Sequence, residues 1–175
     1  LGLEVAIQAS AGATAFYPDR DYSTCRIVDS AADLLQAADI LLTVQPLETE
    51  AISQLREGSV VVGFMHPHEH PERIAMLRDR NITSFSMELI PRISRAQGMD
   101  ALSSQASIAG YKGALLAAEH TARFFPMLTT AAGTIRPAKV LVIGVGVAGL
   151  QAIATAKRLG AMVEAYDVRP ETREQ

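Results

Sequence analysis

The chain has 175 residues and a formal net charge of −3, from 16 Lys and Arg against 19 Asp and Glu. This balance supplies no basic stripe for a phosphate backbone, which argues against nucleic-acid binding. Cys25 is the single cysteine, so no internal disulfide can form, and no Cys/His spacing predicts a metal site. The longest nearly apolar run, residues 140–150, has 11 residues, whereas a membrane-spanning helix needs about 20. We therefore expect a soluble globular protein without a membrane span or a bound metal.

Both ends of the chain fall close to regular structure. Residues 3–7 already have the pattern of a strand directly after Leu1, and the chain stops at Gln175 shortly after another strand. We therefore expect a fragment, with sequence missing on both sides.

Short apolar runs alternate with helical patterns through the first half of the chain. The strand-like runs are rich in β-branched or large apolar residues and lie at residues 39–44, 59–64 and 82–85. Helical patterns lie at residues 30–38, 48–56 and 71–80. Ser30 and Asp33 have capping-box spacing, with Asp in place of the usual Glu or Gln. Because strands that alternate with helices are joined by right-handed crossovers, this half predicts an open, mainly parallel α/β sheet.

A long helix is predicted over residues 101–125, with Pro126 marking its end. Alanine and glycine dominate this stretch, which includes Gly110 and Gly113. A glycine inside a helix costs about 1 kcal/mol relative to alanine. Close approach of another backbone would offset that cost, so we expect a tightly packed connecting helix. A Thr/Ala/Gly loop is expected from there to Pro137.

The sequence that follows has the pattern of a dinucleotide-binding turn. An apolar strand at residues 139–143 runs into GVGVAG, and a helix at residues 150–159 and a second strand at residues 162–166 follow. In this βαβ context Gly144 permits the tight turn, Gly146 lets the backbone approach a pyrophosphate, and Gly149 lets helix and strand pack closely. The pyrophosphate would lie at the positive end of the helix. A glycine-rich turn can also be a simple tight connection, but the flanking elements favour dinucleotide binding.

Asp167 ends the second strand and favours NAD over NADP. A carboxylate at this position hydrogen-bonds the adenosine ribose hydroxyls and repels a 2′-phosphate; the alternative is a solvated turn carboxylate. Arg169 indicates the opposite preference, because an arginine just past this strand can accept a 2′-phosphate. We expect the acid to decide, and predict NAD(H) as the cofactor. The candidate cofactor-binding residues of this unit are Gly144, Val145, Gly146, Val147, Ala148, Gly149, Asp167, Val168 and Arg169.

A group of polar residues lies just before and at the start of the long helix. Its members are Arg92, Gln97, Asp100 and Ser103. A cleft between two α/β domains commonly holds a ligand, and an amide, a carboxylate and a hydroxyl could together bind a nicotinamide carboxamide. The alternative is structural: Asp100 caps the helix, Ser103 is a polar residue of its first turn, and Arg92 is solvated.

Three segments of the chain resemble the NAD-binding domain, domain I, of proton-translocating NAD(P) transhydrogenase, in the alanine dehydrogenase/transhydrogenase superfamily. They are residues 91–111, which include RAQGMDALSSQ, residues 125–134, and residues 139–169, which end in YDVR. The resemblance implies an α/β fold with two open, mainly parallel, Rossmann-like subdomains joined by a long helix, both truncated. The expected division is an N-terminal subdomain at residues 1–91, a nicotinamide-site segment with the connecting helix at residues 92–137, and the start of the NAD-binding subdomain at residues 138–175.

The same resemblance implies a function. Domain I of this family binds NAD(H) as a homodimer, a separate domain binds NADP(H), and hydride passes directly between the two nicotinamides, coupled to proton translocation through a membrane domain. We accordingly expect a Re/Si-specific NAD(P) transhydrogenase, with this fragment inactive alone. The expected location is the cytoplasmic face of a bacterial inner membrane or, in a eukaryote, the mitochondrial matrix side.

Carried over by position, the resemblance makes Arg92, Gln97, Asp100 and Ser103 the catalytic group at the nicotinamide end. Gln97 would lie beside the incoming NADP(H) domain, and Tyr111, a further candidate cofactor-binding residue, would lie near the site. Gly98 departs from the family pattern, in which a small polar residue is expected, and this affects the stiffness of the local backbone. Hydride transfer between two nicotinamides moves no substrate proton, so the site needs positioning and exclusion of water, not an acid/base pair.

Two other functions stay open. Alanine dehydrogenase shares the two-domain architecture by resemblance and needs a base and a cation that binds the carboxylate. His66, which follows a predicted strand and precedes Pro67, could be that base, although a structural histidine at a strand end is the simpler interpretation. The RAQGMDALSSQ segment favours transhydrogenase. The other alternative is a nucleotide-binding regulatory module without chemistry of its own.

Overall fold

The computed structural model describes residues 2–174 and divides into two compact units. Unit 1 is Leu1–Met99 and unit 2 is Asp100–Gln175. Both are built from helices and parallel strand pairs, so the α/β class expected from the sequence is confirmed. The finer three-part division at residues 91 and 137 stays a prediction.

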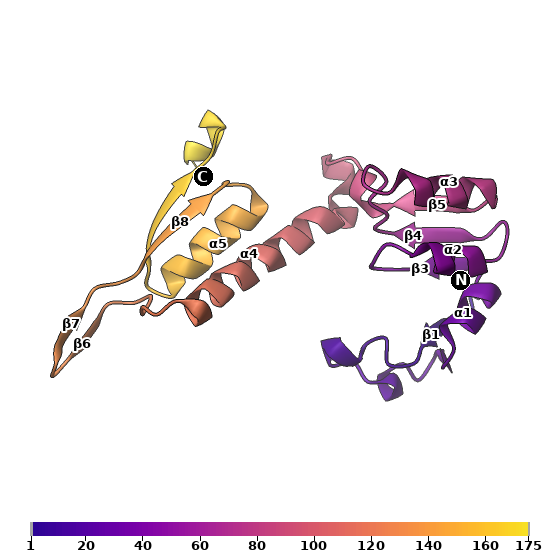
Figure 1. Ribbon diagram of the computed structural model, residues 1–175, viewed down its shortest axis with the longest axis horizontal. Helices are drawn as coiled ribbons and strands as arrows, with labels where there is room; N and C mark the ends of the chain where they lie inside the picture. Colours follow the sequence, from indigo (N-terminus) through magenta and orange to yellow (C-terminus); the bar gives the residue numbers. More distant parts are fainter. Residues whose placement is uncertain (1, 175) are drawn as a thin grey trace. The chain divides into compact units, whose positions relative to one another are not determined.

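Unit 1 holds two groups of parallel strands (Figure 1). A pair is formed by β1 (Ala6–Gln8) and β2 (Arg26–Val28), and a three-stranded sheet has the order β3 (Ile40–Leu42), β4 (Val60–Gly63), β5 (Thr83–Ser86). The helices between them are α1 (Ala31–Ala37), α2 (Thr49–Gln54) and α3 (Pro71–Asp79). The sequence missed β2, because three residues that include an arginine carry no strand pattern of their own.

One face of the three-stranded sheet forms the core of unit 1. Leu41 and Val61 are buried there with Ile52 of α2 and Leu77 of α3. The alternation of a strand turns Leu42 to the opposite face, where it is 75% exposed. The predicted cap of α1 is confirmed, because the backbone N–H of residue 33 donates to the Ser30 hydroxyl at 3.2 Å.

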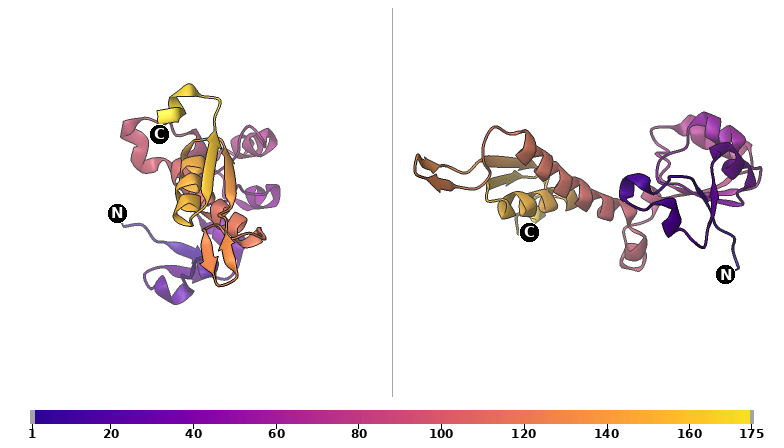
Figure 2. Two further views of the ribbon diagram at one scale, coloured as in Figure 1. Left: turned by 90° about the vertical axis from the view of Figure 1, so that its left-hand side faces the viewer. Right: turned by 90° about the horizontal axis from the view of Figure 1, so that it is seen from below.

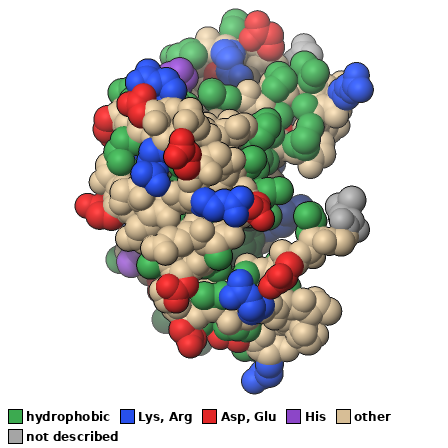
Figure 3. Space-filling model, turned by 90° about the vertical axis from the view of Figure 1, so that its right-hand side faces the viewer, with side chains coloured by type: hydrophobic (Ala, Val, Ile, Leu, Met, Phe, Trp, Pro, Cys, Tyr) green, Lys and Arg blue, Asp and Glu red, His purple; other side chains and the backbone are tan. Residues whose placement is uncertain are grey.

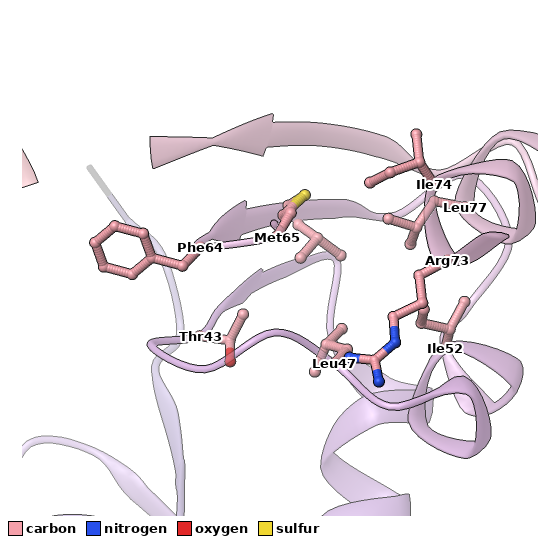
Figure 4. Close-up of a pocket in the computed structure, with 9 residues that line it drawn as sticks. Thr43, Leu47, Ile52, Phe64, Met65, Arg73, Ile74 and Leu77 are labelled. Atoms are coloured by element: carbon pink, nitrogen blue, oxygen red, sulfur yellow. The ribbon is translucent and has the colours of Figure 1, made fainter. Parts of the chain in front are cut away.

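A small void lies within this core (Figure 4). Its volume is about 10 Å³, and its lining includes Leu47, Ile52, Val61 and Leu77. Arg73 borders it and forms an ion pair with Glu48 at 2.6 Å. A volume of this size holds about one water molecule, so the void is a packing feature and not a substrate pocket.

Unit 2 is built on two helices that lie side by side, α4 (Ala101–His120) and α5 (Val147–Arg158) (Figures 1 and 2). A Cβ on Gly110 of α4 would clash with the carbonyl oxygen of Ala148 in α5. The close backbone approach expected of the glycine-rich helix is therefore confirmed at Gly110. It is wrong for Gly113, where an added Cβ would meet no described atom within 4 Å.

Helix α4 ends five residues earlier than predicted. Thr121 leaves the helix in an extended conformation, with φ −80° and ψ 141°. The carbonyls of Phe124 and Phe125 instead accept hydrogen bonds from the Ala138 N–H, at 3.1 and 3.2 Å. Phe125 is buried with Ala138 and Ala156 in the core of unit 2. Tertiary packing thus ends the helix before the proline does.

The remaining strands of unit 2 form two pairs. β8 (Lys139–Ile143) and β9 (Met162–Tyr166) are parallel and have the predicted bounds. β6 (Leu128–Thr130) and β7 (Gly133–Ile135) form an antiparallel hairpin that projects from β8 and β9 (Figures 1 and 2). The loop expected over these residues is wrong: its two-residue turn is Ala-Ala, which lacks the Asn-Gly or Asp-Gly signal of a tight hairpin.

Candidate functional site

The turn between β8 and α5 is the best-defined candidate site of unit 2. Gly144 follows β8 with φ +94°, a conformation that favours glycine, and its N–H donates to the Tyr166 carbonyl of β9 at 2.7 Å. Helix α5 begins at Val147, three residues earlier than predicted, directly after Gly146. The turn therefore places the first residues of α5 beside the ends of both strands.

The glycines of this turn have different surroundings. A Cβ on Gly149 would clash with the Gly144 carbonyl oxygen, so close packing requires glycine there. Among the described atoms within 4 Å, a Cβ on Gly146 would meet only a guanidinium nitrogen of Arg169, at 3.9 Å, and the backbone at Gly146 has no side-chain cap. The surface above Gly146 is therefore open to a ligand that approaches the backbone closely.

Asp167 connects the end of β9 to this turn. Its carboxylate accepts hydrogen bonds from the Val145 N–H at 2.7 Å and from the Arg169 N–H at 2.9 Å. The Arg169 guanidinium also donates to it, at 3.0 and 3.1 Å. The guanidinium first, and then the backbone donors, hold the pKa of Asp167 well below its ordinary value of 3.8, so the group is an anion at neutral pH.

The other candidate cofactor residues surround this cluster. Val145 is buried, and Val147 at the start of α5 is 40% exposed. Ala148 directs its carbonyl toward Gly110 of α4. Val168, between Asp167 and Arg169, is 81% exposed. The nine residues predicted from the glycine motif thus lie around one turn and the end of one strand.

The candidate nicotinamide residues fall in both units. Arg92 and Gln97 belong to unit 1, are exposed, and lie before and within a 3₁₀ turn at Ser94–Met99. Asp100 and Ser103 belong to unit 2 and contact one another. Asp100 accepts from the Ser103 N–H at 2.9 Å and from its hydroxyl at 2.6 Å, which caps α4.

Asp100 therefore has the helix-capping role that was one of its two predicted roles. Tyr111 lies further along α4 and is 50% exposed. At Gly98, where the chain departs from the family pattern, an added Cβ would meet no described atom within 4 Å. The local packing does not require glycine at that position.

A partly buried contact in unit 1 has no counterpart in the sequence predictions. One carboxylate oxygen of Glu88 accepts from the N–H groups of Met65 and His66, at 2.8 and 2.5 Å, and His66 has φ +47°. Burial would raise the pKa of Glu88, but these backbone donors and its own N–H outweigh it and leave the pKa below 4.5. Glu88 follows β5 and His66 follows β4, so only strand pairing brings them together; no local signal marks the contact.

Three further features bear on function. Within residues 2–174, no three His, Cys, Asp or Glu side chains gather as a metal site would require. Over the same residues, no helix combines the length and apolar character needed to span a membrane. On the face drawn in Figure 3, acidic and basic side chains are interspersed.

The sequence and fold match known proteins over almost the whole chain. The family model described as "Alanine dehydrogenase/PNT, N-terminal domain" matches residues 1–109, and "Alanine dehydrogenase/PNT, C-terminal domain" matches residues 113–175. The chain is 45% identical over 177 residues to NAD(P) transhydrogenase subunit alpha of Cereibacter sphaeroides, covering 100% of this chain and 34% of that protein. It is 30% identical over 177 residues to alanine dehydrogenase of Mycolicibacterium smegmatis, covering 98% of this chain and 47% of that protein.

The solved structure of transhydrogenase from Sinorhizobium meliloti superposes with a TM-score of 0.93 at 47% identity. The match covers 99% of this chain and 52% of that one, so the chain spans between about a third and about half the length of the relatives it matches. The two family models and these similarities show that this chain belongs to the alanine dehydrogenase/PNT family, and that along its whole length it is similar to the alpha subunits of NAD(P) transhydrogenases.

Proposed function

We propose that this chain binds NAD(H) at the turn between β8 and α5 and presents its nicotinamide for direct hydride exchange with NADP(H) held on a partner domain. The observation that carries the proposal is the geometry of the glycine turn. Gly149 is required by packing, whereas Gly146 has open space above it, at the start of a 12-residue helix. A pyrophosphate at that position would be stabilised by the N–H groups and the dipole at the helix start.

The nicotinamide end is proposed to involve Arg92, Gln97, Asp100 and Ser103, with Tyr111 nearby. Amide and carboxylate groups suit a carboxamide, which both donates and accepts hydrogen bonds. The hydride passes from the C4 carbon of one nicotinamide to that of the other, and no substrate proton has to be removed. These residues would therefore position the ring and exclude water.

The remaining features of the proposal concern the assembly. They are a homodimer, an NADP(H)-binding partner domain, and a membrane domain whose proton translocation is coupled to the hydride step. The chain would then lie on the cytoplasmic face of a bacterial membrane or the matrix side of a mitochondrial one. The similarity to transhydrogenase alpha chains, which are named as subunits, supports this arrangement.

The nucleotide site is tested by Gly146→Ala in the full natural polypeptide. The backbone of Gly146, at φ −84°, accepts alanine. The free energy of unfolding of the variant should therefore lie within about 0.5 kcal/mol of that of the parent. Its methyl group would occupy the space needed by the pyrophosphate, and NADH affinity should fall by about tenfold or more. Gly113→Ala, equally open but on α4, is the control that should keep full affinity. Unchanged binding by Gly146→Ala would place the nucleotide elsewhere.

The reaction is tested separately, by mixing the polypeptide with the NADP(H)-binding domain. Reduction of acetylpyridine adenine dinucleotide by NADH should then depend on NADP(H), and should be lost in Asp100→Asn and Gln97→Asn. NADH formation from alanine in place of this exchange would favour the alanine dehydrogenase alternative. Two observations are the reason for testing this alternative. The backbone of His66 after β4 is held by Glu88, and the chain is 30% identical to an alanine dehydrogenase. Binding without either reaction would indicate a non-catalytic module.

A further inference from the structure

Both oxygens of the Asp167 carboxylate already accept hydrogen bonds from donors of the same chain. One oxygen, Oδ1, accepts from the backbone N–H and the Nε–H of Arg169, at 2.9 and 3.0 Å. The other oxygen, Oδ2, accepts from the Val145 N–H at 2.7 Å and from a terminal guanidinium nitrogen of Arg169 at 3.1 Å. A carboxylate offers about four lone-pair positions, and these four donors use them.

The four donors differ in how easily they can leave. Two are backbone N–H groups, which the turn and the end of β9 hold in place. The other two belong to the Arg169 side chain, which is 57% exposed, whereas the Asp167 side chain is 7% exposed. Rotation of this side chain requires no movement of the backbone. Its departure would free two acceptor positions, the number that the two hydroxyls of a ribose need.

The guanidinium that would leave is also the right group to bind a phosphate. Its planar array of N–H donors pairs with phosphate as it does with carboxylate, through two parallel hydrogen bonds. In this structure the fork formed by the Nε–H and one terminal N–H of Arg169 is paired with Asp167. Arg169 also borders the open surface of the turn, since one of its nitrogens lies 3.9 Å from where a Cβ on Gly146 would be.

Building on the nucleotide site proposed above, we propose that the ion pair with Asp167 masks Arg169 as a binding site for a 2′-phosphate. Asp167 holds the Arg169 fork away from a 2′-phosphate, and an unmodified ribose displaces the fork from Asp167. Arg169 is then a latent 2′-phosphate site that opens when residue 167 loses its negative charge. The carboxylate of Asp167 would thereby bind the ribose of NAD(H) and also mask Arg169, the group that would bind the 2′-phosphate of NADP(H).

The test is Asp167→Asn in the natural polypeptide, titrated separately with NADH and NADPH by calorimetry in the absence of partner subunits. NADH affinity should fall by about tenfold, and NADPH affinity should rise by about tenfold or more, the effect of freeing a charge-assisted pair of hydrogen bonds. The matched control is Asp167→Asn combined with Arg169→Ala, in which the gain of NADPH affinity should disappear.

The outcomes separate this inference from the proposed function. A loss of NADH affinity without a gain of NADPH affinity overturns the inference and leaves the nucleotide site in place. NADH binding that is unchanged in both Asp167→Asn and Gly146→Ala overturns the site itself, and the inference with it. A gain of NADPH affinity that survives Arg169→Ala also overturns the inference, because another group would then bind the 2′-phosphate.

Asparagine keeps an oxygen that can accept from the Val145 N–H, but folding must still be checked by circular dichroism. If Asp167→Asn does not fold, Arg169→Ala alone carries the test, since its side chain is exposed. A masked fork contributes nothing to NADPH binding, so that affinity should stay within about threefold of the parent. A fall of about tenfold or more would show that Arg169 already binds the 2′-phosphate, contrary to the inference.

Discussion

At the scale of single residues, two residues of the same type can have different structural roles in this chain. Gly146 and Gly149 are three residues apart in one motif, yet only Gly149 is fixed by packing, against the Gly144 carbonyl. Asp100 and Asp167 are both carboxylates with backbone partners, but Asp100 caps a helix and Asp167 ties the end of β9 to the glycine turn. A variant at each position therefore reports on a different property.

Asp100 allows its capping role to be separated from any role at the nicotinamide. Asp100→Ala removes the acceptor of the Ser103 N–H and should cost unit 2 about 1 kcal/mol of stability. Asp100→Asn keeps a side-chain oxygen and is about as good a cap, so its cost should stay below about 0.5 kcal/mol. Thermal melting monitored by circular dichroism checks both values.

Equal destabilisation by the two variants would contradict the capping argument, since it would mean that the charge, not the oxygen, holds the start of α4. If Asp100→Asn is stable but fails in hydride exchange, the carboxylate has a second role beyond the cap. Ser104→Ala is a suitable control, because its exposed hydroxyl donates to the backbone carbonyls of Asp100 and Ala101 at the same helix start.

At the scale of elements, the contact between α4 and α5 explains why the long helix carries so much alanine and glycine. Gly110 lies against the Ala148 backbone, and Ala114 is also buried. Small side chains let the two helices approach closely, which offsets the cost of glycine inside a helix. The same stretch has no strong apolar stripe, because backbone proximity replaces large side chains in this contact.

Two glycines of α4 provide a matched test of this contact. Gly110→Ala places a methyl group against the Ala148 carbonyl and should destabilise unit 2 by about 1–3 kcal/mol through overpacking. Gly113→Ala meets no described atom within 4 Å and should stabilise the helix by up to about 1 kcal/mol. Urea unfolding followed by circular dichroism gives both values. Opposite signs are expected, and stabilisation by both would show that the helices separate readily.

At the scale of the whole molecule, each unit has its own core and its own stabilised carboxylate. Unit 1 packs around Ile52 and Val61, and unit 2 around Phe125 and Ala156. Glu88 in unit 1 and Asp167 in unit 2 both have a pKa below the ordinary value in the folded state. Their contribution to stability is therefore complete above the unfolded pKa and is lost as the pH falls through the folded pKa.

Acidification should accordingly destabilise both units. The urea midpoint should fall between about pH 6 and pH 3, because protonation weakens charge-assisted hydrogen bonds to the backbone. Glu88→Gln should flatten this dependence in unit 1, and Asp167→Asn should flatten it in unit 2, as read from amide exchange of residues in each unit. A midpoint that rises on acidification would contradict the lowered pKa values.

Much of the fold could be predicted from local sequence. The bounds of β8 and β9 are those expected, because Pro137 and Gly144 flank β8, Gly160 precedes β9, and β8 is rich in apolar, β-branched residues. From α1 to β5, the order of helices and strands in unit 1 also followed from alternating patterns. The glycine turn could also be recognised from local sequence, because its tight backbone requires glycines at fixed spacing.

Tertiary structure decided what local patterns do not encode. Helix α4 ends at His120 because the backbone of residues 124–125 pairs with Ala138, and β2 exists only because it pairs with β1. The contact of Glu88 with His66 joins two loops after neighbouring strands. The sequence supplied Asp167 and Arg169 as competing indications of cofactor preference, and the structure joined them in one ion pair. Turns and periodicities are properties of neighbouring residues, whereas these contacts depend on which distant segments the fold brings together.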